Sequence, residues 1–439
     1  MQGRYGLTDP AFSGRCAVRS NGSPIQRLLI VSDVASVLHL YIGVFPAMSS
    51  DSSTTGRRVS IGVEEPRLLR DDNEFRGLFA AIVSVLVGFG VVMVHSASIT
   101  SWPTQFEQVY LSRHLTFLIA GVIVAAVCAN LPAKFWLQQA PLLLVGTSLL
   151  LLLVLIPGVG LRVNGAQRWL RLGPISLQPS ELAKIALPLM ACRVILWKPR
   201  DRGWVKEVIA VAIPLLLIIP LVLPEPDLGT SAFLMLSYAI ALFLAGWRLR
   251  FFFAGAVLVL PLLASVVVLR PYQMRRITGF IEAWTNIDTA PWQLKQSLLT
   301  LGAGGLMGVG PGQGSQKLSY LPEANTDFVF AVVGEEFGLM GTLGLVLIWG
   351  ALFLTGLRVL ANSTVIGRSA GTALLTQLTF QAAINVAVVT AMVPPKGIAH
   401  PLISYGGSNL ITSLATVGII LSMSKCVPEP QVSPGVDSD

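Results

Sequence analysis

The sequence contains few charged residues and few cysteines. Only 12% of its 439 residues are Asp, Glu, Lys or Arg, whereas 53% are hydrophobic, and the mean hydropathy is +0.69. Because soluble domains carry about 25% charged residues, this balance excludes an ordinary soluble globular protein and predicts a membrane protein. The cysteines, at positions 16, 128, 192 and 426, show no CxxC or Cys/His spacing. We therefore expect neither a disulfide framework nor a metal site.

The net charge of +8 lacks the pattern that a nucleic-acid-binding protein needs. No run of Lys and Arg is interleaved with aromatic residues, so we expect no nucleic-acid partner. The basic residues instead lie mostly between hydrophobic segments, where they set the orientation of a membrane protein. The arrangement that places most of them in cytoplasmic segments also places the N-terminus and the C-terminus in the cytoplasm.

Hydrophobic stretches long enough to span a membrane recur from residue 75 onward. A bilayer core of about 30 Å requires about 20 helical residues. The sequence therefore predicts an all-α integral membrane protein with about ten transmembrane helices and one large extracytoplasmic loop between helices 7 and 8. The predicted spans are residues 75–94, 114–130, 140–156, 180–197, 208–223, 228–247, 252–269, 327–357, 370–393 and 401–423.

Three regions follow from this count. Residues 1–74 are predicted to form a flexible cytoplasmic extension without catalytic residues, because they include the polar run SSDSSTTG and the mixed charges of RLLRDDNEFR. Residues 75–425 form the membrane domain, and residues 426–439 form a cytoplasmic tail. The long segment at 270–326 is partly amphipathic and then Gly-rich, so we expect a semi-ordered outer cap that lies along the membrane interface.

The stretch SYLPEANTDFVFAVVGEEFGLMG places four acidic residues at the start of the eighth span. Residues 337–357 alone give about 21 apolar residues, or about 31 Å of helix, which is enough to cross the membrane. Asp327 therefore lies beyond the apolar part, at the outer interface or facing a wet cavity. It is either a helix cap, with Asn325 and Thr326 beside it, or an acid that accepts a proton from a substrate hydroxyl. Glu335 and Glu336 are predicted to be paired or hydrogen-bonded structural acids.

Two further polar motifs lie on the predicted outer side. In RWLRLGPISLQPSELAK, Glu181 and Lys184 share one helix face, either as a simple ion pair or as part of a phosphate site together with Arg168. In PEPDLGTS, Asp227 follows Glu225 and is predicted to cap the next helix.

A third motif, PPKGIAHPLISYGGSN, breaks the chain between the last two spans. Lys396 is either an interfacial anchor or a phosphate contact. The segment that contains Ser404, Gly406 and Gly407 exposes backbone groups that need partners in protein or in a wet cavity, although a Gly-Gly kink also serves packing alone.

Taken together, these motifs and GVGPGQGSQKLSYLPEANTDFVFAVVGEEFGLMG closely resemble the SEDS family (shape, elongation, division and sporulation), which includes FtsW, RodA and SpoVE. The resemblance covers about residues 75–425. KLSYLPEA looks more like the division-type FtsW branch, since the elongation-type RodA branch tends to carry a charged residue where Ala324 stands. Departures from the family pattern are Asn325, Pro395 and Asn409.

The resemblance implies a peptidoglycan glycosyltransferase of the bacterial inner membrane, at the division septum, that polymerises lipid II and releases undecaprenyl diphosphate. Its partners would be the undecaprenyl-linked glycan strand, a class B penicillin-binding protein acting as transpeptidase, and other divisome proteins. No cofactor is required, and assistance by a divalent cation is left open. The implied general base is Asp327. The candidate substrate-binding residues are Arg168, Glu181, Lys184, Lys317, Glu323, Lys396, Ser404, Gly406 and Gly407.

Three alternatives stay open. An elongation-type RodA polymerase would carry out the same reaction, and two other functions use the same substrate or partner. A polytopic protein with intramembrane acids and a broken helix could be a lipid II flippase. However, the acids cluster at the outer mouth and no inverted repeat is evident, which favours surface chemistry. A non-catalytic scaffold that activates the transpeptidase is the third alternative, in which Asp327 is only a cap.

Overall fold

The computed structural model describes residues 65–98, 105–163, 166–173, 175–197, 203–225, 227–269, 271–286, 288, 290–316, 321 and 323–425. The chain divides into two compact units, Met1–Asp71 and Asp72–Asp439, and almost all described residues belong to the second. Most of the predicted extension at 1–74, the predicted tail at 426–439 and the candidate residue Lys317 lie outside the described residues.

Each of the ten predicted spans coincides with one helix, so the helical count along the chain is confirmed. These helices are α3 (Glu65–Ser98), α4 (Gln105–Asn130), α5 (Ala133–Leu155), α6 (Pro179–Leu196), α7 (Trp204–Val222), α8 (Leu228–Leu244), α9 (Leu249–Leu269), α12 (Val329–Ala361), α13 (Val365–Val389) and α14 (Gly407–Met423). By length and composition, α3, α4, α5, α7, α12 and α13 qualify as membrane spans within the described part of the chain, while α8 and α14 are apolar but shorter.

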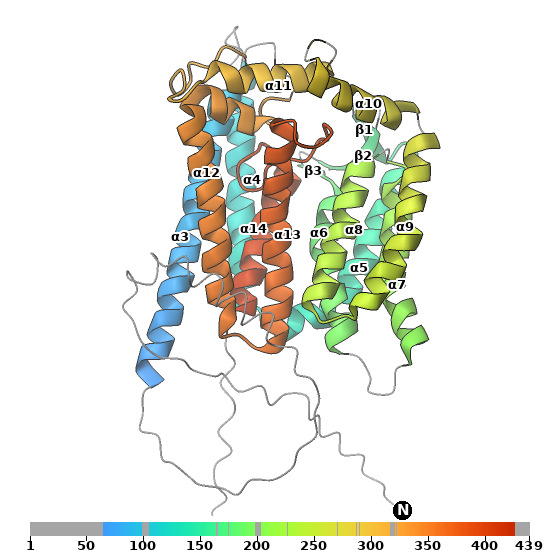
Figure 1. Cartoon of the computed structure of the whole chain (residues 1–439). Helices are drawn as coiled ribbons and strands as arrows, with labels where there is room; N and C mark the ends of the chain where they lie inside the picture. Colours follow the sequence, from blue (N-terminus) through green and yellow to red (C-terminus); the bar gives the residue numbers. More distant parts are fainter. Residues whose placement is uncertain are drawn as a thin grey trace, which may run out of the picture. The chain divides into compact units, whose positions relative to one another are not determined.

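The connections that carry the candidate residues all lie at the same end of the helices, which we name the looped end. Successive helices alternate in direction, which places the α5–α6, α7–α8, α9–α12 and α13–α14 connections together (Figure 1). Across this end lie α10 (Pro271–Thr285) and α11 (Trp292–Ala303), with α10 against α9 and α11 against α12 and α13. Ile281 and Trp284 on α10 and Trp292 on α11 are exposed, as in helices that lie in a membrane interface. The described part of the predicted cap is therefore largely helical.

A small sheet between α5 and α6 departs from the all-α prediction. Strands β1 (Gly160–Val163), β2 (Ala166–Leu172) and β3 (Ile175–Leu177) pair antiparallel in the order β1-β2-β3. The sequence signal is the alternation in AQRWLRL, in which Leu170 is buried between two arginines one and two positions away. Such short strands are stable only when paired, so propensity alone did not reveal them.

Helix α12 is broken at Gly338, whose φ of 65° and ψ of −162° are not helical. The Gly-rich segment after α11 packs into this break. The amides of Val309 and Gly310 donate to the carbonyls of Glu335 and Glu336 at 2.9 Å and 3.0 Å, and the amide of Leu339 donates to Gly305 at 3.0 Å. The Gly-rich run therefore supplies the partners that a buried, interrupted helix needs.

The two acids at the break are hydrogen-bonded, as predicted for structural acids. Glu335 Oε1 accepts from the amides of Ser315 at 2.7 Å and Gln316 at 3.0 Å. Glu336 Oε1 accepts from the hydroxyl of Ser96 on α3 at 2.5 Å. These bonds join α3, α12 and the Gly-rich segment that leads toward Asp327.

Candidate active site

Asp327 lies at the looped end, in the turn that precedes α12. The N-cap residue of α12 is Phe328, and no side-chain hydrogen bond caps this helix. The Asp327 carboxylate is half-buried and accepts no hydrogen bond from any residue that the structure describes. The helix-cap interpretation of Asp327 is therefore wrong, because Phe328 occupies the N-cap position and no side chain caps α12.

The surroundings of Asp327 raise the pKa of its carboxyl group from 3.8 to about 7. Burial is the largest cause, and the negative charges of Glu323 and Asp227 add to it. The positive charges of Arg168 and Lys184 act in the opposite direction. A carboxylate whose pKa lies near neutral pH is suited to accept a proton from a substrate hydroxyl.

The loop between α13 and α14 approaches this carboxylate through Gly397. A Cβ atom placed on Gly397 would lie 2.6 Å from Asp327 Oδ2, so only glycine leaves this side of the carboxylate open. The adjacent Lys396 packs its aliphatic stem on Gly229 at the start of α8, where an added Cβ would lie 2.7 Å from Lys396 Cδ.

The Lys396 ammonium group forms no hydrogen bond or ion pair with a described residue. Burial lowers the pKa of Lys396, and Asp227 and Arg276 shift it in opposite directions. A half-buried cation without a protein partner can bind an anionic ligand at little cost, since no existing ion pair must break. This geometry favours the phosphate-contact interpretation over a membrane anchor.

Arg168, in strand β2, links the small sheet to the start of α8. Its Nε donates to the carbonyl of Glu225 at 2.8 Å, and its guanidinium lies 3.3 Å from Asp227 Oδ2. Asp227 caps α8 as predicted, because its carboxylate accepts from the amide of Thr230 at 3.0 Å. The Arg168 side chain is 28% exposed, so part of it is accessible from outside this network.

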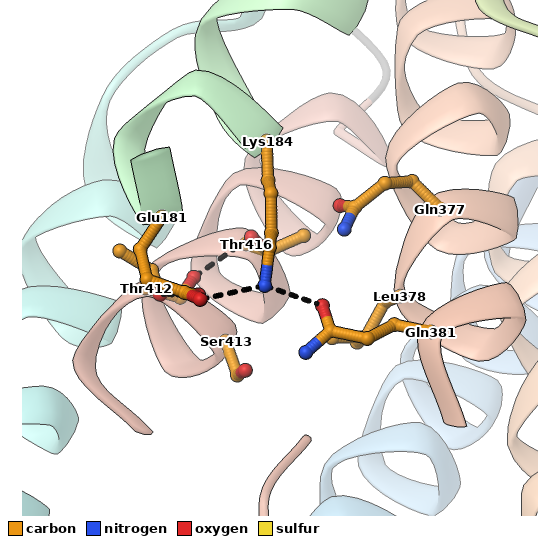
Figure 2. Close-up of a pocket in the computed structure, with 8 residues that line it drawn as sticks. All are labelled: Glu181, Lys184, Gln377, Leu378, Gln381, Thr412, Ser413 and Thr416. Atoms are coloured by element: carbon orange, nitrogen blue, oxygen red, sulfur yellow. Dashed lines mark hydrogen bonds and ion pairs between the residues drawn. The ribbon is translucent and has the colours of Figure 1, made fainter. Parts of the chain in front are cut away.

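Glu181 and Lys184 form the predicted ion pair, with 2.7 Å between Lys184 Nζ and Glu181 Oε1. Lys184 also donates to Gln381 Oε1 on α13 at 3.2 Å, and Thr412 on α14 donates to Glu181 Oε2 at 3.3 Å. Figure 2 shows Lys184 directed between Glu181 and Gln381. The cavity that these residues line has a volume of about 10 Å³, which is room for about one water molecule. The pair is buried and joins three helices, so in this conformation Lys184 is not open to a phosphate.

The remaining candidates occupy different settings. Glu323 is exposed, has a left-handed φ of 53°, and accepts from the Thr326 hydroxyl at 2.9 Å. The Ser404 hydroxyl is buried and donates to the Thr326 carbonyl at 2.5 Å. Gly406 is the N-cap residue of α14, and a Cβ on Gly407 would lie 2.7 Å from the Phe117 ring. Ser404 and Gly407 thus make close protein contacts, whereas Glu323 lies open beside Asp327.

Several residues of the site were not among the predicted site residues. Asn385 binds the backbone of Asp327, Gly397 contacts its carboxylate, and Gln381 completes the Lys184 network. Glu225 is buried, and neither of its carboxylate oxygens has a hydrogen-bond partner among the described residues. The signal for Asn385 and Gln381 was available, because amide side chains inside an apolar span are expensive and are usually functional.

The looped end therefore combines the half-buried Asp327 carboxylate with Lys396, a cation that has no hydrogen bond or ion pair with a described residue. Asp327 can take a proton, while Lys396 and the exposed part of Arg168 can stabilise negative charge on a departing group. Among the described residues, no group of three or more His, Cys, Asp or Glu side chains could hold a metal ion. The arrangement suits transfer of a group from an anionic leaving group to a hydroxyl.

Comparison with known proteins places this geometry in context. Residues 76–428 match the family model FTSW_RODA_SPOVE, described as cell cycle protein. A probable peptidoglycan glycosyltransferase FtsW from Trichlorobacter lovleyi is 37% identical over 355 residues, covering 80% of this chain and 93% of that protein. The corresponding protein from Geobacter metallireducens is 40% identical over 349 residues, with 77% and 92% covered.

Two solved structures share the fold. One, described as "Structural coordination of polymerization and crosslinking by a peptidoglycan synthase complex", has a TM-score of 0.65 and 27% identity, with 79% of this chain and 96% of the other covered. The rod shape determining protein RodA of Thermus thermophilus has a TM-score of 0.58 and 28% identity, with 79% and 95% covered.

Proposed function

Since the chain belongs to the FtsW/RodA/SpoVE family of cell cycle proteins, we propose that it is a peptidoglycan glycosyltransferase that polymerises lipid II during cell division, with Asp327 as general base. The single observation that carries the role of Asp327 is its half-buried carboxylate, which accepts no hydrogen bond from a described residue and whose pKa is raised to about 7. The names of the relatives support the reaction, and the site supports the assignment of its residues.

The reaction joins two lipid-linked sugars. Asp327 accepts the proton of the acceptor's 4-hydroxyl as the hydroxyl oxygen attacks the anomeric carbon of the donor. The new β-1,4 bond forms while the bond from the anomeric carbon to the diphosphate oxygen breaks, and undecaprenyl diphosphate leaves with the electron pair. Lys396 and Arg168 stabilise the charge that develops on the diphosphate. Asp327 then releases its proton to water and is ready for the next addition.

The proposed orientation places the looped end outside the cytoplasm. The helix ends and connections at the opposite end carry Lys134, Arg248, Arg250, Arg358 and Arg368, as expected where the positive charge marks the cytoplasmic side. Asp327 and Lys396 then face the compartment in which the glycan strand grows. The N-terminus and the C-terminus lie in the cytoplasm in this orientation, and the protein acts at the division septum.

The proposed partner is a class B penicillin-binding protein that cross-links the new strand. The similar complex, whose description joins polymerization and crosslinking, supports this pairing. Other division proteins complete the assembly. Lipid II transport and non-catalytic scaffolding remain the alternative outcomes of the test below.

The test compares wild type with Asp327→Asn at matched membrane expression. Both proteins are purified with the transpeptidase partner and incubated with lipid II, and the products are resolved as glycan ladders. We expect ladders from the wild type and a loss of at least a hundredfold in the variant, because removing a general base costs about 10²–10⁴ in rate. Ladders of equal intensity would refute the role of Asp327. Absence of ladders from both proteins would favour transport or scaffolding.

A further inference from the structure

The backbone just before α12 is held by donors from a single neighbouring region. The carbonyls of Asn325, Thr326 and Asp327 accept, in order, from the amide of Tyr405 at 2.8 Å, the hydroxyl of Ser404 at 2.5 Å and Nδ2 of Asn385 at 2.7 Å. All three donors come from α13 or from the loop that joins it to α14. The segment that carries the proposed base is thus bound through three successive carbonyls to α13 and to the loop that carries Lys396.

Asn385 connects the two segments through a single nitrogen. Its Nδ2 also donates to the carbonyl of Ile398 at 2.8 Å, so both protons of the amide group are used. The side chain is 1% exposed, which makes each bond strong and its loss expensive. Ile398 is two residues from Lys396, so this amide fixes the backbone of the base relative to the backbone of the cation.

Ser404 makes the second connection. It is fully buried, accepts from the amide of His400 at 2.9 Å and donates to the Thr326 carbonyl. The nearby Leu402 is buried with a left-handed φ of 64°, a conformation that costs a non-glycine residue free energy and persists only where the surroundings impose it. These contacts therefore hold the loop between α13 and α14 in one conformation.

From these contacts we infer that Asn385 and Ser404 are positioning residues that hold Asp327 and Lys396 at a fixed separation for the reaction. The Asp327 carboxylate itself has no hydrogen bond from a described residue, so its position depends on the backbone beneath it. A base carried by a turn is placed less accurately than one on a helix unless a supporting layer fixes it. The effect on catalysis depends on the proposed function, whereas the bonds themselves do not.

The test uses Asn385→Ala and Ser404→Ala in the full-length protein with its transpeptidase partner. Thr379→Ala is the matched control, because among the described residues the Thr379 hydroxyl bonds only to carbonyls within α13, at 2.9 Å and 3.1 Å. Two quantities are measured for each protein. The first is amide hydrogen exchange of peptides that cover residues 323–330. The second is lipid II polymerisation as kcat, KM and the pH dependence of kcat.

We expect both variants, but not the control, to exchange the 323–330 amides at least tenfold faster. A displacement of about 1 Å can cost about a hundredfold in rate, so kcat should fall about ten- to a hundredfold while KM changes less than about threefold. The acidic limb of the pH profile should move to lower pH, because a loosened carboxylate is better hydrated and its pKa falls.

Three outcomes would overturn the inference. Unchanged exchange in both variants would show that the bonds do not hold the segment. Faster exchange with kcat and a pH profile equal to those of the control would show that the segment needs no fixed position. If the rate fell only in proportion to the fraction of folded protein and the pH profile did not move, Asn385 and Ser404 would have a purely structural role. Hydrogen exchange can be measured without enzymatic activity. Failure of the proposed function would instead appear as full polymerisation activity of Asp327→Asn, so the two failures can be told apart.

Discussion

Substitution of Gly397 by alanine displaces the carboxylate of Asp327, the proposed base, without replacing this ionisable group. The nearest atoms to a Cβ at this position all belong to Asp327, with Oδ2 at 2.6 Å and Cγ at 3.5 Å. Gly397 is exposed and has no left-handed φ, so alanine causes no backbone strain and no other contact. The added methyl group therefore acts on the carboxylate alone.

The size of the effect follows from this distance. An ordinary contact begins near 3.4 Å, so the carboxylate must retreat by roughly 0.8 Å. Because a misplacement of about 1 Å can cost about a hundredfold in rate, we expect kcat of Gly397→Ala to fall about ten- to a hundredfold, which is about 1.4–2.7 kcal/mol. KM should change little, since the base does not bind the lipid-linked sugars in the ground state.

The assay is steady-state polymerisation of lipid II by the complex with its transpeptidase partner. The matched control is Gly302→Ala in α11, also at the looped end, where an added Cβ meets nothing within 4 Å. Thermal unfolding in detergent checks that both variants are folded. Wild-type kcat from a folded Gly397→Ala protein would refute the assignment of Asp327, or its placement beside Gly397.

Two further predictions concern pH. The kcat of polymerisation should fall below a pH of about 7, where Asp327 becomes protonated. Arg168→Gln removes a charge that lowers the pKa of Asp327 and should move this limb to higher pH, whereas Glu323→Gln removes a charge that raises it and should move the limb to lower pH. Movement of both variants in one direction would contradict this electrostatic account. Burial, with a smaller contribution from Asp227, raises the pKa of Glu225 from 4.5 to about 8. The folded state then holds a proton that the unfolded state releases, so the free energy of unfolding falls as pH rises between about 4.5 and 8, by at most about 1.4 kcal/mol per pH unit. Glu225→Gln should remove this loss, so its melting temperature should rise relative to wild type from pH 5 to pH 8. If the difference between the melting temperatures of wild type and Glu225→Gln did not change with pH, the raised pKa of Glu225 would be contradicted.

Sequence alone determined the helices and the identity of the candidate base. Long apolar runs allow one conformation in a bilayer, because each backbone group must find a partner within its own helix. All ten predicted spans are therefore helices in the structure. The excess length before Phe337 and the acid at Asp327 were equally visible, since they follow from residue counts and charge. The cap on α8 by Asp227 followed from local capping chemistry.

Tertiary structure decided how these elements serve one site. The break at Gly338 forms because the Gly-rich segment supplies replacement backbone partners from outside α12, and the strands at 160–177 form only by pairing with one another. Whether Asp327 caps a helix depended on which residue the turn before α12 places at the N-cap position, and that residue is Phe328. Its raised pKa and its support by Asn385 depend on groups far away in the sequence. Burial and electrostatic interaction act through space, so the order of residues along the chain specified the base but not its environment.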